Sequence, residues 1–156
     1  MTEQETWSLV EKTLDHQKFG VLATLMGEYP YTSAVMFAAP PDAKYMVFAT
    51  PRHTRKYVNL KQHPKASIFV NNAANRASDV SEAIGITALG DAAELFNTPE
   101  NQQYFDVLRR KHPSMQEFID SAATAIFMLK IHQYYVVRDF QQVYEFHVQD
   151  KKDDNS

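Results

Sequence analysis

The segment FATPRHTRKYVNLKQHP (residues 48–64) carries the strongest indication of fold and chemistry in this 156-residue chain. A strand-like run ends at Thr50, and Thr54, Arg55 and Lys56 follow at the start of a short predicted helix. Hydroxyl groups, a guanidinium, an ammonium and the free backbone N–H groups of a helix start therefore gather in one place. Such a combination is typical of a site that binds a phosphate monoester.

The charge of the surrounding sequence agrees with an anion site. The chain has a net charge of −3, yet residues 43–78 contain no Asp or Glu and seven Lys or Arg residues. A basic segment on an otherwise acidic chain favours one local anion site over a nucleic-acid-binding face, which needs a broader positive surface. A solvated basic surface without any ligand is the alternative interpretation.

Composition excludes several other classes of protein. The four glycines are not spaced as in G-x-G-x-x-G or in a P-loop, so Rossmann and P-loop nucleotide binding are not expected. The absence of cysteine excludes disulfide frameworks and thiolate metal sites. Because no apolar run is long enough to span a membrane, we expect a cytoplasmic protein with a single domain over residues 1–148 and a polar tail over 149–156.

Strand-like segments dominate the rest of the chain. Apolar and β-branched runs bounded by turn residues predict strands over residues 19–26, 31–39, 45–50, 66–70, 83–96, 124–140 and 142–148. Helices are predicted over 3–17, with a capping box at Ser8-x-x-Glu11, over 54–62, and from an N-cap at Thr98 to residue 110, and 71–81 is read as a loop. Strands without a regular βαβ alternation indicate a mainly β protein, an antiparallel barrel that is closed or nearly so.

The central segment resembles the FMN-binding split barrels related to pyridoxamine 5'-phosphate oxidase. That family has an aromatic residue, then Tyr-Thr or a similar pair, a short loop, [Ser/Thr]-Arg-Lys, Leu and x-x-Asn-Pro. The same spacing is present here in Phe48, Ala49-Thr50, Thr54-Arg55-Lys56, Leu60 and Lys61-Gln62-His63-Pro64. The segments LATLMGEYPYTSAVMFA (22–38) and ITALGDAAEL (86–95) are also similar to family elements. The resemblance implies an antiparallel split β-barrel.

The resemblance also implies a cofactor site and an assembly. Arg55 and Lys56 would hold the phosphate of FMN, with Thr50 and Thr54 donating hydrogen bonds nearby. The strand Ser33-Ala34-Val35-Met36 would run beside the flavin and meet its polar edge with backbone groups. Asn72 and Asn75 are similar to family positions near the cofactor. The family's dimers place the flavin between subunits, so the resemblance implies a homodimer.

The sequence departs from the vitamin B6 oxidases at two places. Ile84-Gly85 stand where those enzymes have a Gln, and the C-terminal segment lacks their Trp, because the only Trp is Trp7. We therefore expect an FMN-dependent oxidoreductase acting on a small molecule other than a B6 vitamer. No residue is assigned as catalytic, since hydride transfer to or from a flavin requires no acid–base pair.

Three alternatives stay open from the sequence. The first two are a flavin-binding and a haem-binding carrier or sensor without turnover, and the third is a reductase that uses the deazaflavin F420. Haem binding would need an axial ligand, and the histidines weighed for this role have no diagnostic spacing: His53, His63, His112, His132 and His147.

Overall fold

The computed structural model describes residues 2–139 and 141–148. The end of the predicted strand at Phe140 and the predicted tail over 149–156 lie outside the described residues. The described strands lie close to the predicted ones: β1 (Phe19–Met26), β2 (Tyr29–Ala38), β3 (Tyr45–Pro51), β4 (Lys65–Asn71), β5 (Ile84–Leu95), β6 (Thr124–Arg138) and β7 (Gln142–His147). The helices are α1 (Glu3–His16), α2 (Arg55–Gln62), α3 (Asp79–Glu82), α4 (Gln102–Lys111) and α5 (Gln116–Asp120), with 3-10 turns η1 (Pro99–Asn101) and η2 (Pro113–Met115).

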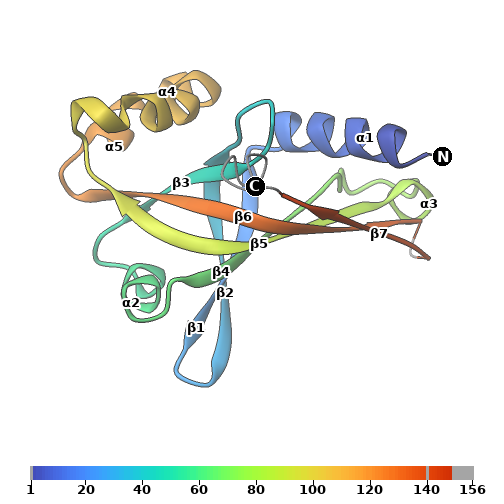
Figure 1. Cartoon of the computed structure of the whole chain (residues 1–156), viewed down its shortest axis with the longest axis horizontal. Coiled ribbons are helices and arrows are strands. Elements are labelled where there is room, and N and C mark those ends of the chain that lie inside the picture. Colours follow the sequence, from blue (N-terminus) through green and yellow to red (C-terminus); the bar gives the residue numbers. More distant parts are fainter. Residues whose placement is uncertain (1, 140, 149–156) are drawn as a thin grey trace, which may run out of the picture.

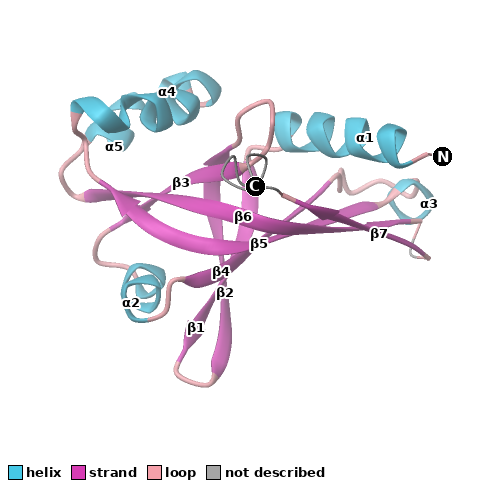
Figure 2. Ribbon diagram, viewed as in Figure 1, coloured by secondary structure: helices cyan, strands magenta, loops and turns pink. Residues whose placement is uncertain are grey.

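The strands form an antiparallel barrel, as the sequence predicts. Their order is β3-β2-β1-β4-β5-β6-β7, and pairing of β3 with β6 closes the first six strands into a ring. The long strands β5 and β6 cross the whole molecule, and the β1–β2 hairpin projects from it (Figure 1). Helices α4 and α5 lie together at one end, while α2 lies on the other side of the sheet (Figure 2). The mainly β, split-barrel prediction is confirmed.

Helix boundaries differ from the prediction at both long helices. Thr2, not Ser8, caps α1: the Glu5 N–H donates to Thr2 Oγ1 and the Thr2 N–H donates to Glu5 Oε2, each over 3.1 Å. Thr2 is the N-cap because it directly precedes the first helical residue and has Glu three positions later. Thr98 makes no side-chain cap, and the predicted helix divides into η1 and α4. The short α3 lies at the edge of the predicted loop 71–81.

Two groups of buried side chains stabilise the barrel. The first fills the barrel interior, where the alternation of β2 points Val35 and Phe37 inward. The second lies on the outer side of β2, β3 and β6, where α4 and α5 cover Met36 and Ala49. Consecutive residues of β2 therefore serve two different cores, and the boundary between these cores is where the candidate site lies.

The structure explains why glycine stands at position 90, which belongs to one of the segments similar to the family. The pairing of β5 with β6 shifts register between Leu89 and Gly90. A Cβ atom at position 90 would lie 2.1 Å from the Lys130 carbonyl oxygen, so no other residue fits without moving the backbone. This close approach, rather than a phosphate, is what the glycine provides.

No helix among the described residues is both long and apolar enough to cross a membrane.

Candidate functional site

The site begins where strands β2 and β3 separate. These strands pair only from Met36 to Ala38 on β2, opposite Val47 to Ala49 on β3. Toward its N-terminal end, β2 pairs with β1 alone among the described strands. Backbone groups on the β3-facing edge near Ala34 and Val35 therefore lie outside any ladder, and buried peptide groups in that position need partners. This edge can donate and accept hydrogen bonds to a planar ligand.

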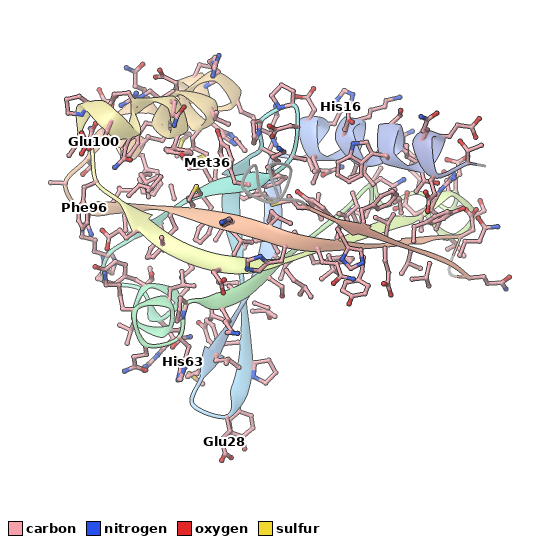
Figure 3. The ribbon with its side chains drawn as sticks, in the orientation of Figure 1. His16, Glu28, Met36, His63, Phe96 and Glu100 are labelled. Carbon is pink, nitrogen blue, oxygen red and sulfur yellow. The ribbon has the colours of Figure 1, made fainter. Side chains whose placement is uncertain are left out.

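A cavity of about 490 Å³ lies at this separation. Figure 3 shows Met36, one of its lining residues, on the side of the sheet that faces α4. The volume falls in the usual range of cofactor pockets. Its lining comes from β2, β3, the start of α2 and the segment around η2: Lys18, Phe19, Ala34, Val35, Met36, Ala49, Pro51, Lys56, Lys111, His112, Pro113, Ser114, Met115 and Phe118.

The predicted threonines build the turn that starts α2. Thr54 is the N-cap, and its Oγ1 accepts from the Tyr57 N–H over 3.4 Å while donating to the Pro51 carbonyl over 2.8 Å. Thr50 is fully buried, and its hydroxyl oxygen lies 2.9 Å from that of Thr54. Both hydroxyls thus fix the helix start locally, and their contact with a phosphate stays a prediction.

The cations of the basic segment are divided between two roles. Arg52 and Lys61 form ion pairs with Glu94, whose side chain is only 3% exposed, and Tyr57 donates to the same carboxylate over 3.1 Å. Burial raises the pKa of the Glu94 carboxyl, but the hydrogen bonds from Arg52, Lys61 and Tyr57 outweigh it and the net pKa is lowered. These two cations therefore already share a carboxylate within the chain.

Arg55 and Lys56 are different. Neither side chain has a hydrogen-bond or ion-pair partner among the residues that the structure describes. Arg55 is exposed, and Lys56 is half-buried with its side chain on the cavity. Both stand in the first turn of α2, where backbone N–H groups also favour an anion. The structure thus brings Lys56 together with Ala34, Val35 and Met36 around one cavity, and their contact with a cofactor stays a prediction.

Ser33 and the two asparagines have other surroundings. Ser33 shares the inward face of β2, and its Oγ is buried without a hydrogen-bond partner in the described part of the chain. Asn72 donates to the Glu82 carbonyl over 2.8 Å and accepts from the Ile84 N–H over 3.0 Å. Asn75, at φ +61°, precedes α3, which lies at the opposite end of the molecule from α2 (Figure 1). A single chain does not bring Asn72 or Asn75 to the cavity.

Comparison with known proteins agrees with this geometry. The model of the pyridoxamine 5'-phosphate oxidase family matches residues 8–138. The chain belongs to this family. No curated protein matches its sequence.

Several solved structures share the fold of this chain at low sequence identity. A heme-binding protein from Mycobacterium smegmatis has a TM-score of 0.75 at 18% identity, over 88% of this chain and 56% of that one. An FAD-binding protein from Mesorhizobium loti has 0.68 at 15%, over 87% and 92%. A protein related to general stress protein 26 from Clostridium acetobutylicum has 0.71 at 15%, over 94% and 97%. This chain thus spans little more than half of the Mycobacterium protein.

Sequence reasoning missed the part of the cavity wall at the C-terminal end of α4. Lys111 donates to the Leu14 carbonyl over 2.7 Å, and its Nζ lies 3.9 Å from the centre of the Phe37 ring. Burial, and after it the charge of Lys18, lowers the pKa of Lys111 to about 8. His112 lies beside it. The sequence signal there, a His-Pro pair after a helix, reads only as a helix end, so the cavity wall was not predictable from it.

Two of the five histidines considered as haem ligands have side-chain hydrogen bonds within the described part of this chain. His112 is buried, and its Nε2 lies 2.8 Å from the Phe37 carbonyl oxygen, to which it must donate. Burial lowers the pKa of His112, with Lys111 and Lys18 adding to the effect. His132 Nε2 lies 2.7 Å from Asp91 Oδ2. Among the described residues no group of three or more His, Cys, Asp and Glu side chains forms a metal site.

Proposed function

We propose that this protein is an FMN-binding flavoprotein that acts as an oxidoreductase on a small molecule. One observation carries the proposal: the side chains of Arg55 and Lys56 have no partner among the described residues, at a helix start beside an open cavity, while the neighbouring Arg52 and Lys61 are paired with Glu94. Two unpaired cations there leave a place for a doubly charged phosphate.

The remaining residues fit the rest of a flavin. The free edge of β2 near Ala34 and Val35 offers backbone hydrogen bonds to the polar side of an isoalloxazine ring, and Met36 and Phe118 offer apolar contact. Bound flavin would supply the redox chemistry, and the chain would hold the ring and admit the substrate. The printed name of the Mesorhizobium protein, which binds FAD, supports a flavin on this fold.

We infer further that two copies associate through the outer face of the barrel. Apolar side chains stand exposed there on neighbouring strands, with Val21 opposite Phe69 and Val137 opposite Val143. A patch of this kind is typical of a protein interface. A dimer would also give Asn75 a cofactor contact across the interface, which a single chain lacks.

The test is a titration of the purified protein with FMN, with F420 and with haem, followed by absorbance and calorimetry. We expect a yellow complex with FMN that NADH or NADPH bleaches. A protein that binds FMN but resists reduction by either donor would be a carrier or sensor. Tight haem binding without FMN binding, in line with the heme-binding Mycobacterium protein, would overturn the proposal, and so would a preference for F420.

A further inference from the structure

We propose that the substrate of this site is an anion, and that its charged group binds at the end of the cavity beside Phe37, between Lys18 and Lys111. We call this place the distal end. The proposal rests on the proposed function, because it assigns Lys56 and Arg55 to the cofactor phosphate and leaves the distal end to a second ligand.

The cavity runs along β2 and has lysines at two places, Lys56 near Ala34 and the pair Lys18 and Lys111 near Phe37. Lys56 and Pro51 line it near Ala34, where β2 and β3 have separated. Three groups gather around Phe37 instead: its N–H donates to the Lys18 carbonyl, its carbonyl accepts from His112, and its ring lies under the Lys111 ammonium. Ala34 and Phe37 are about 10 Å apart at 3.3 Å per strand residue. One phosphate cannot span that distance.

Charges at the distal end lack compensation from within the cavity. Lysines are the charged side chains of the described lining, which contains no Asp or Glu. Lys18 and Lys111 also line a neighbouring cavity of about 660 Å³, whose lining includes Glu11 and Asp15. The charge of Asp15 raises the pKa of Lys111, against the larger lowering effects of burial and Lys18. Lys18 is exposed, and its side chain has no hydrogen-bond or ion-pair partner in the described part of the chain. An anion between the two ammonium groups would relieve their repulsion.

The walls near the distal end indicate what accompanies the charge. Phe19 is 65% exposed directly after Lys18, and Met115 lines the same cavity. Exposed aromatic and thioether surfaces favour a flat apolar body. A planar carboxylate combines these two properties, and benzoate is a suitable probe, with benzamide as its neutral counterpart of the same shape.

The experiment measures benzoate and benzamide binding by calorimetry, with and without FMN, to the wild type and to two variants. Lys18→Gln removes the unpartnered ammonium, and Lys12→Gln removes an exposed lysine of α1 that lines neither cavity. We expect Lys18→Gln to weaken benzoate binding about tenfold, as the loss of a charge-assisted contact does. Benzamide binding, FMN affinity and the Lys12→Gln protein should stay within about twofold of the wild-type values.

The outcomes separate this proposal from the proposed function. Equal affinity for benzoate and benzamide, or a benzoate affinity that Lys18→Gln leaves unchanged, would overturn the anionic substrate even if FMN binds. An equal loss of FMN and benzoate affinity in Lys18→Gln would assign the distal charge to the cofactor and overturn it as well. Failure of the wild type to bind FMN would instead reject the proposed function, and the titration without FMN would still decide whether the distal end selects anions.

Discussion

At the scale of single residues, the start of α2 shows how one basic segment serves two purposes. Arg52 and Lys61 are held by Glu94, and Arg55 and Lys56 are not held by any described residue. The four cations are indistinguishable by composition. What distinguishes them is pairing with one residue, Glu94, which lies on β5.

Removing both unpaired cations should weaken FMN binding. Each charge-assisted contact to a phosphate contributes about 1.5 to 3 kcal/mol, so Arg55→Ala with Lys56→Ala should lower FMN affinity at least about a hundredfold. Fluorescence quenching of FMN on titration with protein measures this. Lys65→Ala is the matched control, because Lys65 belongs to the same acid-free segment but follows the other end of α2. If the double variant keeps wild-type affinity, the phosphate binds elsewhere.

Lys111 should make stability depend on pH. Its pKa is lowered to about 8 in the folded chain from 10.5, first by burial and then by Lys18, against the smaller effect of Asp15. Between these pH values the unfolded chain holds more protons, so the free energy of unfolding should rise with pH, by less than about 1.4 kcal/mol per pH unit. Urea denaturation from pH 7 to 10 should show this rise relative to Lys111→Met. Lys12→Met should titrate like the wild type, and parallel curves for the wild type and Lys111→Met would refute the effect.

At the scale of elements, Glu94 joins three parts of the fold. It lies on β5 and binds Arg52 after β3 and both Tyr57 and Lys61 on α2. Arg52 in turn donates to the Ala122 carbonyl over 2.9 Å, which fixes the start of β6. Glu94 thus ties the helix that carries Arg55 and Lys56 to the barrel. Asn59, which donates to Thr24 on β1 over 3.1 Å, and the buried Leu60 hold the same helix.

Neutralising this carboxylate should loosen α2. Glu94→Gln keeps the size of the side chain but leaves Arg52 and Lys61 without a counter-ion, and we expect a loss of about 2 kcal/mol in the free energy of unfolding, since both cations are partly exposed. Chemical denaturation measures the loss, and FMN affinity should fall with it. Glu100→Gln, at an exposed position before α4, should change stability by less than about 0.5 kcal/mol. Equal stability of the two variants would show that Glu94 is not an anchor.

At the scale of the whole molecule, one outer face of the barrel exposes several large apolar side chains to solvent. Helices α4 and α5 cover the outer side of β2, β3 and β6, whereas the outer side of β1, β4 and β7 exposes Val21, Phe69 and Val143. A second copy would cover this face.

Charged residues on that face should therefore separate the copies. We expect the wild type to sediment at twice the chain mass of 17.9 kDa, and Phe69→Lys and Val143→Lys at the mass of one chain. Phe96→Lys is the control, since Phe96 is exposed at the end of β5 near α4 (Figure 3). Circular dichroism should show that all variants are folded. A dimer that survives both substitutions would place the interface on another face.

Local pattern was enough for the parts of the prediction that proved right. Apolar and β-branched runs bounded by turn residues located all seven described strands. The helix predicted over 54–62 is α2, with Thr54 as its N-cap. The errors are local too. Thr2 caps α1 instead of Ser8, and Thr98 makes no side-chain cap. Several residues of each segment are of a type that suits an N-cap, and residue type alone does not show which of them directly precedes the helix.

By itself the sequence determined the barrel class, the family and the position of the basic turn, because strand periodicity and motif spacing are properties of neighbouring residues. Only the tertiary structure decided which cations are free, since Glu94 is 33 residues from Lys61 along the chain. It also decided that Lys111 and His112 border the same cavity as Met36, because the helix carrying Lys111 packs across β2 and β3. Contacts over such separations leave no periodic signal, and they are what turns a basic segment into a site.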